Sequence, residues 1–182
     1  MNDPNWQELL AEMQEGTREV THPFHYATLA TLGLDQIPRL RTIVLREFDP
    51  EELRITFYTD LRSKKVLHIK ENNRVSLLCF HPGLMLQLRF EGLAVRERSE
   101  EVLAHYRTLV PEETRIEYRS AQTPGTVISG PDRIEYLDRD DYFSVIHIHP
   151  FKIEYLRLNR PRHKRIRYSK RKDGWKGEFL VP

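Results

Sequence analysis

The sequence predicts a single, mainly β domain in which antiparallel strands close into a barrel and a few helices are inserted. Apolar and polar residues alternate with a period of two over much of the chain, which is typical of strands with one buried face. Short turns rich in Gly, Pro, Asn and Asp separate these stretches, and such turns imply antiparallel pairing. About seven to nine strands result, and a sheet of that size usually closes on itself.

A helix is predicted near the start of the chain, over residues 4–15, because Asp3 fits an N-cap and apolar residues recur at helical spacing after it. Strands are expected at residues 24–33, 38–48, 53–58, 74–80, 84–96, 143–149, 151–158, 166–170 and 175–180. Further helices are expected at residues 63–71, 98–109, 111–118 and 133–141.

Length and composition are those of one soluble globular domain. The chain has 182 residues, of which 39% are hydrophobic and 31% charged, so it can bury one full core but not two ordinary ones. A formal charge of +2 does not require a nucleic-acid partner. The single cysteine, Cys79, lies in an apolar run and is expected to be a buried core residue.

The N-terminal sequence lacks the basic and apolar regions of a signal peptide. No apolar run approaches the roughly 20 residues that span a bilayer. We therefore expect a cytoplasmic protein without a membrane partner.

A basic, hydroxyl-rich stretch at residues 39–65 is the strongest local candidate for a binding site. Its cationic and hydroxyl side chains are Arg41, Arg46, Tyr58, Thr59, Ser63, Lys64 and Lys65. A helix start here would offer backbone N–H groups and a positive dipole end to a phosphate. Strict alternation places Arg41 and Arg46, five residues apart, on opposite faces of one strand. The alternative interpretation is a solvated basic turn beside ordinary strand charges.

Two other segments carry weaker signals. Residues 157–172 hold nine Lys or Arg in sixteen positions, which is compatible with nucleic-acid phosphates, a small anionic ligand or a solvated barrel exterior. His147 and His149 have metal-ligand spacing on a strand, but no further ligand stands at a defined spacing. A structural role is favoured for both histidines, and no metal is expected.

Taken together, these segments resemble the pyridoxamine 5′-phosphate oxidase family, flavoproteins with a split β-barrel that bind FMN at a dimer interface. The resemblance runs from about residue 22 to residue 182. It is carried by RTIVLREFD at 41–49, FYTDLRSKK at 57–65, NNRVSLL at 72–78 followed by Gln87, and Trp175, Lys176, Leu180 and Pro182 near the end. The segment at 57–65 is the most specific of these.

The resemblance implies an FMN site shared between two subunits. Arg41, Lys64 and Lys65 would hold the FMN phosphate, and the backbone at Ile43 and Val44 would lie along the flavin ring. The other positions that it implies for the cofactor are Tyr58, Thr59, Ser63, Gln87, Gln122, Thr123, Phe143 and Arg165. Gln122 and Thr123 would reach the phosphate from the second subunit. Phe143 stands for a family Trp near the flavin, and Arg165 for a family Arg.

The departures from the family concern the substrate. The family's substrate-phosphate Lys is Arg46 here, its Tyr is His105 and its next Arg is Leu109. Its R-x-H element is spread over residues 160–163, so either Arg160 or Arg162 could match it. The candidates for substrate contact are Arg46, Arg162 and His163. The loss of cations weakens the case for a phosphorylated pyridoxine-type substrate.

The resemblance thus predicts a homodimeric, FMN-dependent oxidoreductase in which a hydride passes from substrate to flavin. One alternative is a flavin enzyme of the same fold with another substrate, and another is a flavin or haem carrier without turnover. Residues 1–182 would form one split-barrel domain. Residues 1–20 would be a helical extension, and residues 150–182 a C-terminal barrel and dimerisation region.

Overall fold

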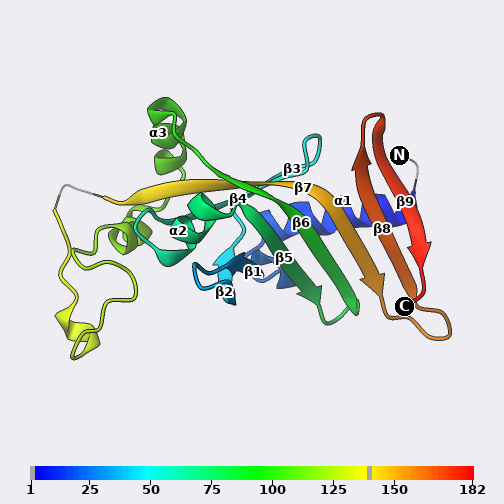
Figure 1. Cartoon of the computed structure of the whole chain (residues 1–182), viewed down its shortest axis with the longest axis horizontal. Coiled ribbons are helices and arrows are strands. Elements are labelled where there is room, and N and C mark those ends of the chain that lie inside the picture. Colours follow the sequence, from blue (N-terminus) through cyan, green and yellow to red (C-terminus); the bar gives the residue numbers. More distant parts are fainter. Residues whose placement is uncertain (1–2, 139–140) are drawn as a thin grey trace.

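The computed structural model describes residues 3–138 and 141–182, and within them nine strands form one antiparallel sheet (Figure 1). The strand order is β2-β1-β5-β6-β7-β4-β3, and β8 and β9 continue the sheet beyond β7. The strands are β1 Tyr26–Leu32, β2 Pro38–Val44, β3 Glu47–Asp49, β4 Arg54–Asp60, β5 Arg74–His81, β6 Leu86–Arg96, β7 Phe143–Arg157, β8 Lys164–Arg171 and β9 Gly174–Leu180.

The sheet curls because its two edge strands are nearly continuous in sequence. β2 ends at Val44 and β3 begins at Glu47, yet they lie at opposite ends of the strand order. Leu45 N–H donates to His25 on one side (2.9 Å), and Arg46 N–H donates to Thr56 on the other (2.9 Å). Only a curled sheet brings both edges to this two-residue link. The split-barrel fold predicted from the sequence is confirmed, but the single strand expected at 38–48 is wrong.

β7 is the longest strand, and it contains Pro150 at the point where two strands had been expected. Its first half pairs with β4 as far as Ile148, and its second half pairs with β8 from Lys152. Pro150 therefore lies between the part of β7 that pairs with β4 and the part that pairs with β8. Neither β4 nor β8 needs a hydrogen bond from the N–H that proline lacks, so β7 is not interrupted. On the other side the register with β6 shifts beside Gly92, where an added Cβ would lie 2.7 Å from the His149 carbonyl oxygen.

The helices are α1 Pro4–Arg18, α2 Lys64–Glu71, α3 Glu100–Thr108 and α4 Glu112–Arg115, with short 3-10 turns η1 Pro23–His25, η2 Ile116–Tyr118 and η3 Pro131–Arg133. Asp3 caps α1 by accepting from Asn5 N–H (2.9 Å), as predicted. The helix expected at 133–141 is wrong over its described part. There Leu137 N–H donates to the Arg119 carbonyl (2.8 Å), so the chain is held by a distant segment; residues 139 and 140 lie outside the described part.

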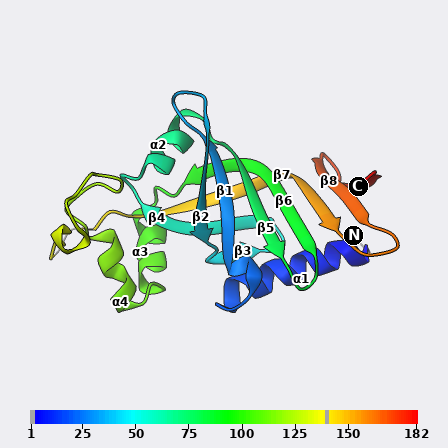
Figure 2. The same cartoon turned by 90° about the horizontal axis from the view of Figure 1, so that it is seen from below.

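α1 packs lengthwise against the sheet and belongs to the main core. In Figure 2 it runs beneath the strands from η1 towards β8. Its residues Trp6, Leu9 and Met13 are buried, and the Trp6 ring lies 4.8 Å from the ring of Tyr168. None of the helices described is long and apolar enough to cross a lipid bilayer.

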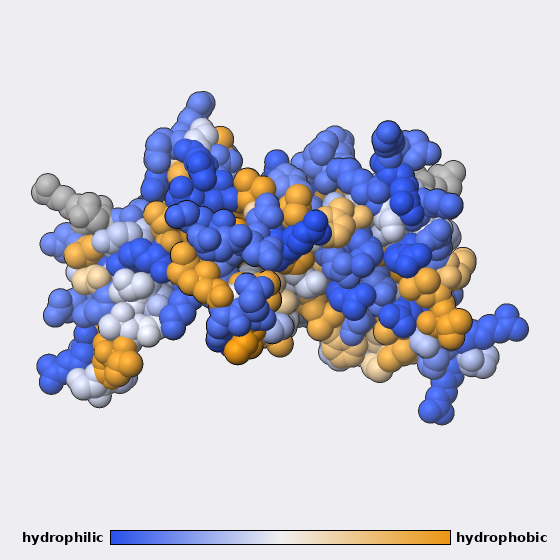
Figure 3. Space-filling model, viewed as in Figure 1, coloured by the Kyte–Doolittle hydropathy of each residue, from blue (hydrophilic) through white to orange (hydrophobic). Residues whose placement is uncertain are grey.

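A second, smaller core lies under α3 and is made by Leu103, Tyr106, Val110, Tyr118, Phe143 and Val145. It adjoins β4, whose Tyr58 packs against it. Outside the two cores, β1, β2 and β5 expose Tyr26, Leu40, Leu78 and Phe80. The space-filling view shows apolar residues interspersed among polar ones on one face of the molecule (Figure 3).

Candidate cofactor site

Two cations meet where β1, β2, β4 and the start of α2 come together. Lys65 Nζ donates to Thr59 Oγ1 at 2.9 Å, and Thr59 Oγ1 lies 3.2 Å from Ser63 Oγ. The Arg41 guanidinium donates to Thr31 Oγ1 at 2.7 Å. Arg41 and Lys65, two of the residues predicted for a phosphate, thus come together, with Thr31 as an addition that sequence reasoning missed.

These two cations stand in an environment that disfavours their charge. Burial lowers the pKa of Lys65, and the charge of Arg41 lowers it further. Burial also lowers the pKa of Arg41. The nearby Asp60 carboxylate forms a 2.7 Å ion pair with Arg62. A bound anion would relieve the remaining repulsion between Lys65 and Arg41.

The start of α2 adds to the positive potential at this place. Ser63 is the residue before the helix, but its side chain makes no capping hydrogen bond and lies instead beside Thr59. The first turn of a helix has backbone N–H groups without intrahelical partners. A phosphate near Ser63 would therefore meet both the dipole and the two side-chain cations.

A pocket of about 330 Å³ opens beside these cations. It is lined by Tyr26, Thr42, Ile43, Val44, Arg46, Tyr58, Thr59, Asp60, Lys65, Glu117 and Tyr118. Ligand pockets commonly measure about 300–1,000 Å³. Sequence reasoning had named six of these residues but missed Tyr26, Thr42, Asp60, Glu117 and Tyr118, most of which lie far from its motifs.

Arg46 lines the same pocket as Lys65, whereas Arg41 is not among the residues that line it. The chain leaves β2 after Val44, so the alternation that predicted opposite faces does not extend to Arg46. The Arg46 guanidinium lies 5.6 Å from the centre of the Tyr58 ring. Arg46 is therefore available to a ligand in this pocket, and the expected division of roles between Arg41 and Arg46 stays a prediction.

An aromatic group closes the inner side of the pocket. Phe143 is buried, and its ring lies 5.1 Å from those of both Tyr58 and Tyr118. Tyr106 of α3 packs 5.8 Å from Tyr58, whereas its neighbour His105 is exposed. The family resemblance had pointed to His105, but in the structure it is Tyr106 that packs against Tyr58 and so joins these aromatic rings.

Four predicted residues lie far from the pocket in the same chain. Leu156 pairs with both Gln87 and Arg165, near the end of β7 opposite to Phe143. Thirteen residues of extended strand separate Phe143 from Leu156, or about 43 Å. Arg162 and His163 lie in the exposed turn before β8. Figure 1 shows β8 well apart from α2, on the other side of the central strands.

Gln122 and Thr123 belong to an arm, residues 119–138, that projects beyond α2 (Figure 1). Within the arm, Gln122 Nε2 donates to the Arg133 carbonyl (3.3 Å), and its Oε1 accepts from Glu135 N–H (3.1 Å). A Cβ added at Gly125 would lie 3.9 Å from Lys64 Cε, so Lys64 reaches towards the arm. Lys65 is thus the lysine that acts together with Arg41, whereas Lys64 lies nearer to the arm.

Comparison with known proteins places these observations in a family. Residues 3–96 match the family described as pyridoxamine 5′-phosphate oxidase, FMN-binding domain. The chain belongs to this family. FMN is accordingly confirmed as the cofactor predicted from the sequence, and the half-buried pair of Lys65 and Arg41 fits a group that carries a phosphate.

Other members of the pyridoxamine 5′-phosphate oxidase family match most of the chain. The pyridoxine/pyridoxamine 5′-phosphate oxidase of Pelagibacter ubique is 29% identical, over 93% of this chain and 88% of its own. That of Rubrobacter xylanophilus is 28% identical, over 93% and 82%.

Two solved structures share the fold. An FMN-binding protein of Nostoc punctiforme related to pyridoxamine 5′-phosphate oxidase superposes with a TM-score of 0.77 at 23% identity and full coverage of both chains. PhzG from Burkholderia lata, solved with tetrahydrophenazine-1-carboxylic acid, gives 0.77 at 20% identity, over 100% of this chain and 98% of its own.

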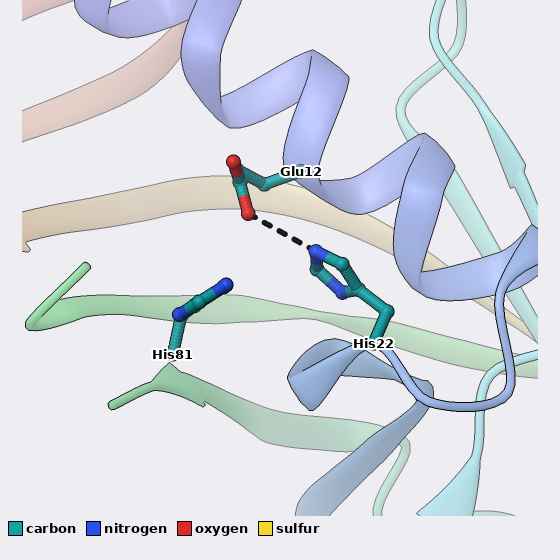
Figure 4. A group of neighbouring side chains, drawn as sticks. All are labelled: Glu12, His22 and His81. Atoms are coloured by element: carbon teal, nitrogen blue, oxygen red, sulfur yellow. Dashed lines mark hydrogen bonds and ion pairs between the residues drawn. The ribbon is translucent and has the colours of Figure 1, made fainter. Parts of the chain in front are cut away.

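A second group of side chains has the residue types of a metal site, but its hydrogen bonds do not suit metal binding. Glu12, His22 and His81 bring their ligand atoms within 4.8 Å of one another (Figure 4). Each ring accepts a backbone N–H at Nδ1, from Phe24 and from Leu84, both at 3.1 Å. A neutral ring that accepts at Nδ1 carries its proton on Nε2, where a metal would need a lone pair. The group is better described as a hydrogen-bonded link, with His22 Nε2 donating to Glu12 at 3.1 Å.

Proposed function

We propose that this protein is a homodimeric, FMN-dependent oxidoreductase of the pyridoxamine 5′-phosphate oxidase type. The observation that carries the proposal is the half-buried pair of Lys65 and Arg41, of which Lys65 lines a pocket of ligand size. When bound, FMN supplies the hydride acceptor, and the protein supplies binding, orientation and charge.

The chain's own residues divide the work of holding the cofactor. Arg41, Lys64 and Lys65 hold the phosphate, with the hydroxyls of Thr59 and Ser63 beside them. By the family resemblance, the backbone at Ile43 and Val44 would lie along the ring system, and both residues line the pocket together with Lys65. Tyr58 and Phe143 form the aromatic wall on the inner side. In this arrangement the protein would bind the phosphate of the cofactor with its cations and would shield the ring system from water with its aromatic side chains.

A second subunit completes the site. Gln87, Gln122, Thr123, Arg165, Arg162 and His163 are the predicted residues that this chain does not bring to its own pocket. A two-fold dimer allows one end of each chain to meet the other end of its partner. The exposed apolar residues Tyr26 and Leu40 lie beside the pocket strands, where a second copy would cover them.

Two measurements on the purified protein test the function. We expect it to be yellow, with flavin absorbance and one FMN for each subunit. We then expect anaerobic mixing with an oxidisable substrate to bleach that absorbance. A colourless protein that takes up no added FMN would refute the proposal at its first step.

A second candidate keeps the cofactor and changes the substrate. His105 and Leu109, which stand for two substrate-binding residues of the family, are both exposed on the outside of α3 and its end. Leu109 cannot bind a phosphate. Anaerobic mixing with pyridoxamine 5′-phosphate separates the two candidates, since only the first predicts complete bleaching by that compound.

A further inference from the structure

A row of hydrogen-bonded side chains connects helix α2 to the Arg41 guanidinium. His68 of α2 and Thr31 of β1 are both buried. Arg41 Nη1 donates to Thr31 Oγ1 at 2.7 Å and to the Leu29 carbonyl at 3.3 Å. Thr31 Oγ1 also lies 3.0 Å from His68 Nδ1. One hydroxyl of β1 therefore links the guanidinium on β2 to the imidazole on α2.

The direction of both hydrogen bonds of Thr31 follows from the chemistry of arginine. A guanidinium has donors and no acceptor, so Thr31 Oγ1 accepts from Arg41 and its hydroxyl proton is left to donate. We assign His68 Nδ1 as the acceptor of that proton, and the neutral ring then carries its own proton on Nε2. A hydroxyl that donates in this way is polarised and becomes a better acceptor for the guanidinium. His68 therefore acts on Arg41 through Thr31.

The surroundings of His68 favour the neutral ring that this arrangement needs. Burial lowers the pKa of His68 below its ordinary value of 6.5. The charged groups around the ring act in both directions, with three cations that lower the pKa further and one carboxylate that raises it: Arg41, Arg39 and Lys64, and Asp35. At neutral pH the ring is therefore an acceptor at Nδ1 and adds no positive charge to the cofactor site.

Arg41 benefits from such an anchor because its neighbour in the site is also a cation. The charge of Arg41 lowers the pKa of Lys65, so the two side chains repel each other until an anion lies between them. Each cation is held by a threonine hydroxyl, Lys65 by Thr59 at 2.9 Å and Arg41 by Thr31. A binding group that is already oriented loses less conformational freedom when its ligand arrives, so the ligand binds more tightly.

We propose that Thr31 and His68 are positioning residues of the cofactor site: the Thr31 hydroxyl, oriented by His68 Nδ1, holds the Arg41 guanidinium in place for the FMN phosphate. The inference rests on the proposed function and adds to it two residues outside the segments that carry the family resemblance. It also gives α2 two roles, because Lys65 supplies charge directly and His68, almost one turn further on, acts through Thr31.

Two substitutions at Thr31 test the proposal on the full-length protein freed of FMN. FMN is added, and flavin fluorescence gives its dissociation constant. Thr31→Val keeps the branched shape but removes the hydroxyl, and we expect it to weaken FMN by about fivefold or more. Thr31→Ser keeps the hydroxyl and should restore most of the affinity. Binding by Thr31→Val that is as tight as in the parent protein overturns the proposal.

His68→Asn and His68→Leu form a second pair, of similar volume. Asn offers an amide oxygen as an acceptor, whereas Leu has none. We expect His68→Leu to weaken FMN by about threefold or more, and His68→Asn to bind FMN more tightly than His68→Leu does. Leu favours a helix more than Asn does, so an effect through the stability of α2 would give the opposite order. That opposite order overturns the role of His68, and this pair decides the proposal if Thr31→Val does not fold.

A double-mutant cycle shows whether Thr31 acts through Arg41. If it does, Thr31→Val changes the FMN dissociation constant little once Arg41→Gln has removed the guanidinium. An equal fold-change with and without Arg41→Gln overturns the positioning role.

The parent protein separates this inference from the proposed function. A parent protein that takes up no FMN contradicts the proposed function and the positioning role together. A parent protein that binds FMN, with unchanged binding in Thr31→Val, contradicts the positioning role alone.

Discussion

A single hydroxyl connects α3 to the barrel at the edge of the candidate site. Tyr106 OH donates to Glu47 Oε2 at 2.6 Å, and Thr56 Oγ1 donates to the same oxygen at 3.4 Å. Burial, with the bond to Glu47, raises the pKa of Tyr106 to about 12, so the hydroxyl keeps its proton at neutral pH. This charge-assisted bond adds to the buried contacts of Leu103 and Tyr106 that hold α3 beside Tyr58.

We expect Tyr106→Phe to lower the free energy of unfolding by about 1.5–3 kcal/mol, because a partly buried carboxylate loses a donor. Urea denaturation of the two proteins measures the difference. Tyr136→Phe is the control, since Tyr136 is exposed in the arm. Equal stability of Tyr106→Phe and the parent protein would show that the bond has no net effect.

At the scale of single residues, sequence reasoning succeeded where side chains are close in sequence. Thr59, Ser63 and Lys65 were named together, and they are in contact. It failed for Tyr26 and Tyr118, which line the pocket from segments outside the named stretch. Neither contact leaves a local signal in the chain.

At the scale of elements, the partly buried carboxylate of Glu8 binds α1 to the barrel. Glu8 accepts hydrogen bonds from Tyr155 and Arg157, which both lie on β7. Burial alone would raise the pKa of Glu8, but these bonds outweigh it and leave the pKa below the ordinary 4.5. A lowered pKa in the folded state means that Glu8 stabilises the fold above about pH 4.5 and loses this effect as the pH falls through the folded-state value.

We therefore expect the difference in thermal stability between the parent protein and Glu8→Gln to narrow on acidification from pH 7 to pH 3. Thermal unfolding followed by circular dichroism at several pH values measures this. Glu15→Gln, an exposed position on the same helix, is the control. A difference that stays constant with pH would contradict the assigned role of Glu8.

Elements were predicted well where their own residues determine them. The alternation in β6 and the caps of α1 and α3 are local, and these elements lie where expected. The break between β2 and β3 and the continuity of β7 through Pro150 depend on which strands lie alongside. Strand neighbours are set by the tertiary structure, so they cannot be read from any single segment of the sequence.

At the scale of the whole molecule, the proposed dimer is the feature that a single chain leaves open. We expect a mass of about twice 21.7 kDa in sedimentation equilibrium. Leu40→Glu combined with Phe80→Glu should shift the mass towards one subunit and reduce FMN content together, because both apolar side chains are exposed on β2 and β5, the two strands that flank β1, beside the pocket where we propose that the second copy lies. Val20→Glu, also exposed but near the end of α1, is the control. A monomer that keeps its FMN would contradict the shared site.

The central claim is that Lys65 and Arg41 hold the FMN phosphate, and the direct measurement is the dissociation constant of FMN from variant apoproteins. Flavin fluorescence is followed as FMN is added to the parent protein, Lys65→Met, Arg41→Gln and the control Lys70→Met, which changes an exposed lysine of the same helix. We predict that Lys65→Met and Arg41→Gln each weaken FMN by about tenfold or more, while Lys70→Met leaves it unchanged. FMN binding that is equally tight in all four proteins would contradict the account.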